Sequence, residues 1–299
     1  MIYNFRQTIQ QGIKLLFKNN KFIWLFWGAN ILFGVILSLP IYYILEDNLI
    51  HSVYSQKLSF GFDYTWYLQF MQLYKTTIGE IPYMIYGTVG VYILIQVFFV
   101  GGLISVFNIP GKNHYVDFFY GGVRYWYRFT KIMLISLIFY AIAFLINDYL
   151  GLLVKMLFSD SARMTDFILR GSRYILLIFL IGLVSIISDY TKVAIAVRDS
   201  EGVWTEIINV IKFLVKNFYQ VFLIYFLVAC VGAAGALIYN FTDSFLPKTT
   251  YAYFGLAFIL QQLLIIFRLF VKMLFVSTEV TIYKDLNAGT IFTYAEELN

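Results

Sequence analysis

Charged residues are scarce in this chain of 299 residues. They make up 13% of the sequence and hydrophobic residues 61%, whereas roughly a quarter of the residues of a soluble domain are charged. This balance excludes an ordinary soluble enzyme. Disorder is excluded as well, because disordered chains are poor in aromatic residues and this sequence has 25 tyrosines and 31 phenylalanines.

Cysteine and histidine are also rare, which limits the chemistry open to the chain. The one cysteine, Cys230, cannot form an internal disulfide, and two histidines far apart in sequence do not make a typical zinc site. The sequence contains no Walker-type glycine-rich loop, no G-x-S-x-G and no H-E-x-x-H. We therefore expect no catalytic residues, no metal site and no cofactor, and we predict that the protein is not an enzyme.

Long hydrophobic runs are what the chain has in abundance. About 20 consecutive apolar residues cross a bilayer core of roughly 30 Å. Six segments reach this length, at approximately residues 22–45, 82–107, 132–153, 174–197, 218–240 and 252–276. The sequence therefore predicts an all-α integral membrane protein with six transmembrane helices, in which residues 1–299 form a single polytopic domain.

The distribution of basic residues predicts the orientation of these spans, because positively charged loops stay on the cytoplasmic side. With a cytoplasmic N-terminus, 15 of the 22 lysines and arginines lie on that side and 7 on the other, where the first loop covers roughly residues 46–81. Both termini are thus predicted to be cytoplasmic, in a cell (inner or cytoplasmic) membrane. The net charge of +5 then belongs to a surface that faces anionic lipid, and no nucleic acid partner is expected.

Three similar basic segments precede the first, third and fifth spans. They read GIKLLFKNNKF at 12–22, GVRYWYRFTKI at 122–132 and VIKFLVKNFYQ at 210–220. In each, two basic residues four positions apart share one helix face: Lys14 and Lys18, Arg124 and Arg128, and Lys212 and Lys216. We interpret each segment as an amphipathic helix in the membrane interface, followed by a transmembrane hairpin. This predicts three parallel repeats, approximately 1–111, 112–200 and 201–299.

Apolar stripes accompany the basic pairs of the first and third segments. The predicted stripes are Phe5, Ile9, Ile13 and Leu16, and Val203, Ile207, Ile211 and Leu214. The polar face of the third segment is predicted to hold Glu206, Asn209, Lys212 and Lys216. The six basic residues of the three segments are candidate contacts for anionic lipid, and a partner membrane protein or a second copy of the chain is the other possible partner.

Five charged residues toward the cytoplasmic ends of spans four and six form a candidate intramembrane cluster. They are Asp189, Lys192, Arg268, Lys272 and Glu279. Placing a charged side chain inside a bilayer costs free energy, so such residues usually have an oppositely charged or polar partner or a functional role. Two interpretations follow: Asp189 pairs with Arg268 or Lys192 and locks the helices together, or the cluster is part of a path for an ion, a proton or a solute.

Uncharged residues within the spans predict helix packing. Asn30, Gln96, Gln261 and Gln262 are expected to donate hydrogen bonds between helices. Seven of the eight residues from Ala229 to Ala236 are small, which favours close approach of helix backbones in lipid.

The stretch SDYTKVA at 188–194, followed by Val197-Arg198-Asp199 and by IKFLVKN at 211–217, resembles uncharacterised bacterial six-span membrane proteins. In these a span ends in Asp-Tyr-x-Arg/Lys and a basic helix leads into the next span. The layout is also similar to the membrane domain fused to some bacterial glycerophosphodiester phosphodiesterases, whose catalytic portion has no counterpart here. The resemblance covers about thirty residues. It implies the six-span fold and makes Asp189 and Lys192 family-typical positions, but it implies no activity.

Two functional hypotheses follow. The first is a non-enzymatic membrane module that interacts with lipid or a partner protein through its basic cytoplasmic face. The second is a small-solute or ion transporter or channel that uses the charged cluster at the inner ends of spans four and six.

Overall fold

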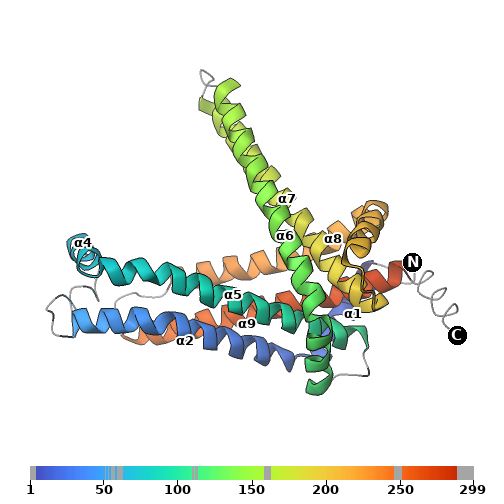
Figure 1. Ribbon diagram of the computed structural model, residues 1–299, viewed down its shortest axis with the longest axis horizontal. Helices are drawn as coiled ribbons and strands as arrows, with labels where there is room; N and C mark the ends of the chain where they lie inside the picture. The colour runs from blue at the N-terminus through green and yellow to red at the C-terminus, as the bar shows by residue number, and fades with distance from the viewer. Residues whose placement is uncertain are drawn as a thin grey trace. The chain divides into compact units, whose positions relative to one another are not determined.

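The part of the chain that the computed structural model describes is almost entirely helical (Figure 1). The structure describes residues 5–50, 52, 54, 58, 63–109, 111, 114–157, 163–245 and 251–287. The helices in these residues are α1 (Phe5–Lys18), α2 (Phe22–Leu49), α4 (Tyr64–Leu73), α5 (Lys75–Asn108), α6 (Tyr115–Leu157), α7 (Arg163–Arg198), α8 (Val203–Ser244) and α9 (Tyr251–Leu286).

Six helices of the described residues are long and apolar enough to cross a membrane. Their segments are Phe22–Leu49, Gly79–Asn108, Tyr115–Met156, Phe167–Arg198, Val203–Ser244 and Gly255–Leu286. Each corresponds to one predicted run, so the six predicted apolar helices are present and could each cross a membrane, which indicates a multi-pass membrane protein. Helices α6 and α8 are longer than a bilayer requires, because the basic segments before the third and fifth runs continue into the spans, without a break in α6 and across a kink at Asn217 in α8.

A short helix, α4, lies in the loop predicted at roughly 46–81. Asp63 is its N-cap, since its carboxylate accepts hydrogen bonds from the backbone N–H groups of Thr65 and Trp66 at 2.9 and 3.1 Å. The Trp66 indole in turn donates to Asn48 near the end of α2 at 3.2 Å. The loop is therefore partly helical, which the sequence analysis did not predict.

The chain forms two compact units, each assembled from separate stretches of sequence. Unit 1 contains Met1–Asn19, Val97–Ala229 and Met273–Asn299, and unit 2 contains Asn20–Gln96 and Cys230–Lys272. Helices α5, α8 and α9 each pass from one unit into the other. The unit boundaries do not coincide with the predicted repeat boundaries near residues 111 and 200, and the three repeats stay a prediction.

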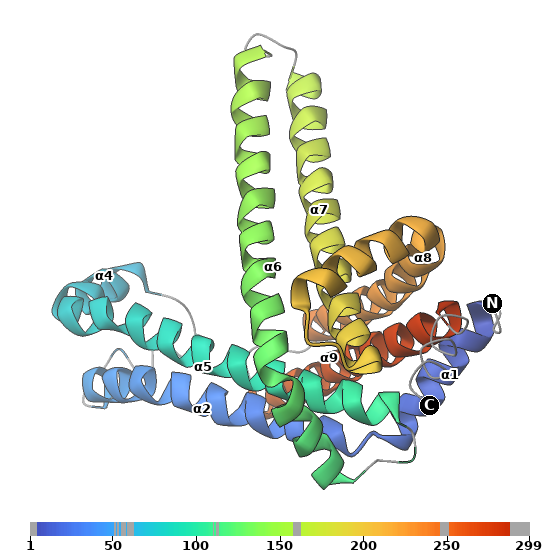
Figure 2. The ribbon, with the colours of Figure 1, turned by 45° about the vertical axis from the view of Figure 1, so that its right-hand side comes forward.

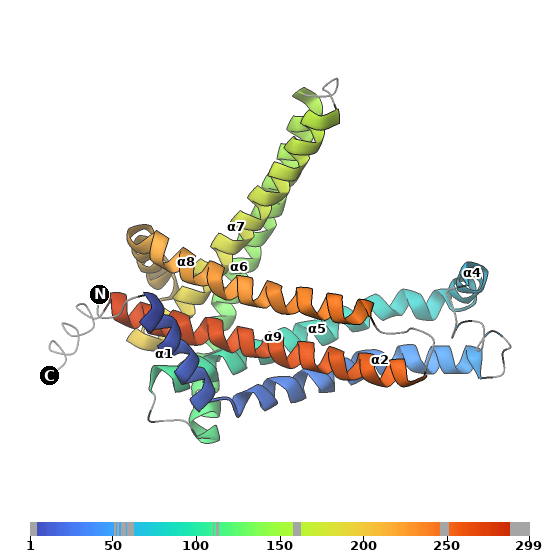
Figure 3. The same ribbon diagram turned by 180° about the vertical axis from the view of Figure 1, so that it is seen from behind.

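Unit 2 is held together by hydrogen bonds between α2, α5 and α9, which run side by side (Figure 3). The three bonds are Trp27 Nε1 to Gln262 Oε1 at 3.1 Å, Tyr92 OH to Asn30 Oδ1 at 2.5 Å, and Lys272 Nζ to Gln96 Oε1 at 2.6 Å. They join the three helices pairwise. The interhelical role predicted for Asn30, Gln96 and Gln262 is confirmed, although each accepts the bond rather than donating it; Gln261 is exposed.

The small residues of α8 lie against α9 in the same unit. A Cβ added to Gly235 would lie 2.0 Å from the ring of Phe267, and one added to Gly232 would lie 3.4 Å from Val271. The predicted close packing at this run is therefore present, and its partner is α9.

Unit 1 contains the antiparallel hairpin of α6 and α7, whose helices lie side by side (Figure 2). The other elements of this unit are α1, the last part of α5, the first part of α8 and the last part of α9. The largest fully buried side chains of the described residues belong mostly to this unit, among them Tyr190, Tyr283, Phe107, Phe118 and Phe129.

Helices α5 and α6 meet through two pairs of glycines, at 101–102 and 121–122. A Cβ added to Gly102 would lie 2.4 Å from the backbone oxygen of Phe118, and one added to Gly121 would lie 2.3 Å from Cβ of Ser105. The absence of side chains thus lets the two backbones touch, as small residues do between helices in lipid.

This contact predicts opposite effects of one substitution at two sites. Alanine is favoured over glycine in a helix by about 1 kcal/mol, so Gly182→Ala in α7, where nothing lies within 4 Å of an added Cβ, should leave stability unchanged or raise it. Gly102→Ala should instead destabilise the protein by about 1–3 kcal/mol, the usual range for overpacking. Thermal unfolding in detergent, followed by tryptophan fluorescence, measures both. Equal stability of the two variants would contradict the contact.

Candidate functional site

The C-terminal ends of α5, α7 and α9 meet in unit 1 and form what we call the junction. The side-chain amide of Asn108, the last residue of α5, donates to the carbonyl of Ala196 in α7 at 3.1 Å. Lys284 in the last turn of α9 donates to the carbonyl of Asn108. The last carbonyls of a helix lack partners within it, and a cation is favoured there by the helix dipole. The junction thus satisfies the ends of α5 and α7 with side chains of neighbouring helices.

The end of α7 is also bound by two arginines of α6. Asp199 directly follows α7 in the left-handed conformation, with φ of 52°, and its carboxylate pairs with Arg124 and with Arg128, the latter at 3.3 Å. Arg128 also donates to the carbonyl of Ser200 at 3.0 Å and lies 3.8 Å from the carboxylate of Glu201. Both arginines are predicted lipid contacts, but their described partners are acidic and backbone groups, so they fasten α6 to α7.

Glu206 in the first turn of α8 is buried, with 5% of its surface exposed. Its carboxylate lies 3.5 Å from the guanidinium of Arg198, which also stacks over the ring of Tyr283 at 5.8 Å. The prediction that Glu206 belongs to the exposed polar face is therefore wrong. Arg198 compensates the buried charge, and the pair ties the start of α8 to the end of α7.

Three of the five residues of the predicted charged cluster come together in unit 1. Lys192 Nζ lies 2.7 Å from Asp189 Oδ1, and the side chains of these residues are 17% and 33% exposed. Glu279 is 4% exposed and close enough to interact electrostatically with both. Its Oε1 atom is buried without a hydrogen-bond partner in the described structure.

Two hydroxyl groups extend this cluster. Tyr225 of α8 and Ser185 of α7 are joined by a hydrogen bond of 3.1 Å, and Ser185 Oγ donates to Asp189 Oδ2 at 3.4 Å. The cluster therefore links α7, α8 and α9. Neither hydroxyl is among the predicted members. The spacing of four residues between Ser185 and Asp189 places both on one helix face, a signal that could have identified Ser185, whereas nothing in the sequence shows that Tyr225 approaches Asp189.

Arg268 and Lys272, the other two predicted members, belong to unit 2. Lys272 donates to Gln96 and lies over the ring of Phe26 at 5.0 Å. Arg268 is exposed. Of the two partners considered for Asp189, the described ion pair is with Lys192.

The lysines of α1 and of the first part of α8 remain at the surface. Lys14, Lys18, Lys212 and Lys216 are all exposed. We call these four residues the basic surface.

The face by which α1 packs differs from the predicted stripe. Leu16 is fully buried as predicted, but its neighbours on the buried face are Thr8, Gly12 and Asn19, whereas Ile9 and Ile13 are half-buried and the side chain of Phe5 lies outside the described residues. A Cβ added to Gly12 would lie 2.7 Å from Thr278 of α9. Small residues therefore allow α1 to pack closely against α9, and the buried face of α1 differs from the predicted apolar stripe.

The predicted stripe of α8 is closer to the structure. Val203, Ile207 and Leu214 are buried as predicted. The fourth buried position is Val210, whereas Ile211 is 42% exposed. Both stripes thus direct the lysines away from the packed face of their helix.

The ion pair predicts the effect of removing its cation. Lys192→Met should destabilise the protein by about 2–3 kcal/mol, less than the about 3–5 kcal/mol of a fully buried pair, because Asp189 keeps 33% of its side chain exposed. Adding Glu279→Gln to this variant should recover part of the loss, since one of two uncompensated carboxylates is removed.

Thermal unfolding of Lys192→Met, of the double variant and of a control variant, Lys212→Met, measures these changes in stability. The control changes the same residue type at an exposed position and should have little effect. No recovery on adding Glu279→Gln would show that the cluster does not act through charge compensation.

Comparison of the chain with protein-family models, with curated proteins and with solved structures finds no match. The resemblance to bacterial six-span proteins therefore stays a prediction that rests on the residues quoted above.

Proposed function

We propose that the chain is a non-enzymatic module of a bacterial cytoplasmic membrane that binds anionic lipid, or a partner protein, through the basic surface. The observation that carries this proposal is the placement of Lys14, Lys18, Lys212 and Lys216. All four are exposed on helices whose opposite faces are packed into unit 1. Cytoplasmic leaflets are anionic and attract basic residues by about 1 kcal/mol each. Lipid is thus the partner that this charge favours most directly.

The basic segments of α1 and α8 end in a similar way. An asparagine follows the second lysine in each: Asn19 donates to the carbonyl of Leu15 at 2.9 Å and Asn217 to that of Phe213 at 3.0 Å. Helix α1 ends just before the first asparagine, and α8 is kinked at the second. In α6 the aligned residue is Phe129, and α6 continues as one helix. These equivalent breaks support a repeat that places an amphipathic helix before the first and fifth spans.

The proposal predicts a lipid-dependent stability. A ligand that binds only the folded state raises the unfolding temperature, so phosphatidylglycerol added to the protein in neutral detergent should stabilise it, and less so at high salt. Replacing all four lysines of the basic surface by glutamine should remove most of this effect while leaving the unfolding temperature without lipid nearly unchanged.

Phosphatidylcholine, which has no net charge, is the control lipid. Stabilisation by phosphatidylglycerol that is unchanged in the glutamine variant would contradict a role of the basic surface in lipid binding. Affinity capture that depends on the lysines without a lipid effect would favour the partner protein.

A small-solute or ion transporter or channel is the second candidate, and one observation favours it. Glu279 is a buried carboxylate with one oxygen that has no described partner, beside Asp189 and Lys192. Buried ionisable groups within membrane helices often mark ion or proton paths. If this function holds, proteoliposomes should show a flux of protons or monovalent cations that Glu279→Gln reduces at least tenfold. Absence of flux in the unmodified protein would remove this candidate.

A further inference from the structure

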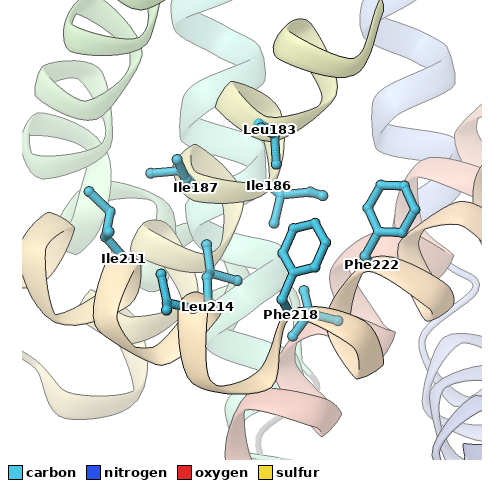
Figure 4. Close-up of a pocket in the computed structure, with 9 residues that line it drawn as sticks. Leu183, Ile186, Ile187, Ile211, Leu214, Phe218 and Phe222 are labelled. Carbon is cyan, nitrogen blue, oxygen red and sulfur yellow. The ribbon is translucent and has the colours of Figure 1, made fainter. Parts of the chain in front are cut away.

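An apolar groove lies between α7 and α8 in unit 1. Its volume is about 320 Å³, at the lower end of the range of about 300–1,000 Å³ for small-molecule sites. Ile186 and Ile187 of α7 face Ile211, Phe218 and Phe222 of α8 across it (Figure 4). All nine side chains that line the groove are apolar. The groove therefore suits a hydrocarbon chain and offers nothing to a polar solute.

Helix α8 is kinked within the stretch that lines this groove. Asn217 departs from helical geometry, with φ of −118° and ψ of 22°. Residues on both sides of Asn217, Ile211 and Val215 before it and Phe218 and Phe222 after it, line the groove. Their spacing of three and four residues places them on one face of α8.

Aromatic rings stiffen one wall of the groove. Phe218 and Phe222 are stacked with ring centroids 5.4 Å apart, and Phe222 contacts Phe179 of α7 at 6.2 Å. The wall is thus held by contacts that do not depend on a ligand. Such preorganisation lowers the cost of binding.

A second cavity, of about 100 Å³, adjoins the groove. The two share Ile187 and Ile211 as lining residues. The second cavity also reaches α6, and Ser136, Ser188 and Thr191 contribute to its lining. The apolar space along α7 is therefore longer than the groove alone.

Two lysines of α8 directly follow residues that line the groove in the sequence. Lys212 follows Ile211, and Lys216 follows Val215, and both lysines are exposed. Long apolar space next to two cations matches one class of molecule, an anionic amphiphile with a hydrocarbon tail. Basic pockets between transmembrane helices on the cytoplasmic side bind anionic lipid headgroups in other proteins.

We propose that one acyl chain of an anionic phospholipid lies in the groove between α7 and α8, with the lipid phosphate at Lys212 and Lys216. This inference rests on the proposed function and makes it specific, because it assigns one of the two lysine pairs of the basic surface to a discrete site. Lys14 and Lys18 are on α1, which lines neither of these two cavities, and would contact lipid without such a site.

Photo-crosslinking tests the proposal. The probe is a phosphatidylglycerol with a diazirine near the middle of one acyl chain, incorporated with the intact protein into nanodiscs of phosphatidylcholine. Mass spectrometry of the peptides after irradiation should find adducts concentrated in residues 183–187 and 211–222. Val215→Trp fills the groove and should reduce these adducts at least fivefold. Ile208→Trp is the matched control, since Ile208 lies on the same helix, is 53% exposed and does not line the groove.

A second pair of variants tests the headgroup. Two lysines near an anionic lipid contribute about 1 kcal/mol each, which corresponds to about 30-fold in affinity. Lys212→Gln with Lys216→Gln should therefore weaken binding of phosphatidylglycerol, measured by competition with the probe, about 30-fold at the groove. Lys14→Gln with Lys18→Gln should leave the groove adducts unchanged.

The outcomes separate this inference from the proposed function. Adducts spread evenly over the lipid-facing helices, unaffected by Val215→Trp, would overturn the groove as a lipid site even if the four lysines still bind anionic lipid. Adducts in the groove that are equally frequent with a phosphatidylcholine probe would overturn the role of Lys212 and Lys216. Adducts lost with both groove and lysine variants would support the site.

Discussion

Hydrocarbon forms no hydrogen bonds with polar groups, so the polar side chains of long membrane helices have to find partners within the protein. In unit 2 this constraint produces the three bonds that join α2, α5 and α9. In unit 1 it produces the junction, where the side chains of Asn108 and Lys284 donate hydrogen bonds to backbone carbonyls at the ends of neighbouring helices. A few polar contacts thus fix which helices meet, while the apolar surface between them needs no specific partner.

The arginines around the end of α7 and the lysines of the basic surface have different surroundings. Arg124, Arg128 and Arg198 are held by Asp199, Glu201 and Glu206 around the end of α7. The exposed lysines of α1 and α8 lie on faces that the packing leaves open. Arginine suits the first role because its planar group makes several hydrogen bonds at fixed angles. Lysine on a helix surface suits reversible contact with a charged membrane, and the proposed function depends on this division.

The sequence predicts the long helices well because a run of about 20 apolar residues is required of any helix that crosses a bilayer. It also predicts that Asn30, Gln96 and Gln262 bond between helices, since lipid itself offers them no partner. It does not show which helices meet. The glycines at 101–102 and 121–122 are visible in the sequence, yet their contact depends on the crossing of α5 and α6. Likewise, Glu206 carries a charge that predicts exposure, and only the position of Arg198 explains its burial.

We propose that the lysines of α1 and of α8 lie on the same, cytoplasmic side of the membrane. Site-specific labelling with a membrane-impermeant maleimide tests it most directly, in a background where the exposed Cys230 is replaced by serine. Single cysteines at Lys14 and Lys212 should react in inverted vesicles and not in right-side-out vesicles, and a cysteine at Leu73 of α4, 70% exposed, should show the reverse. Reaction of positions 14 and 212 on opposite sides, or of both from the outside, would contradict the account.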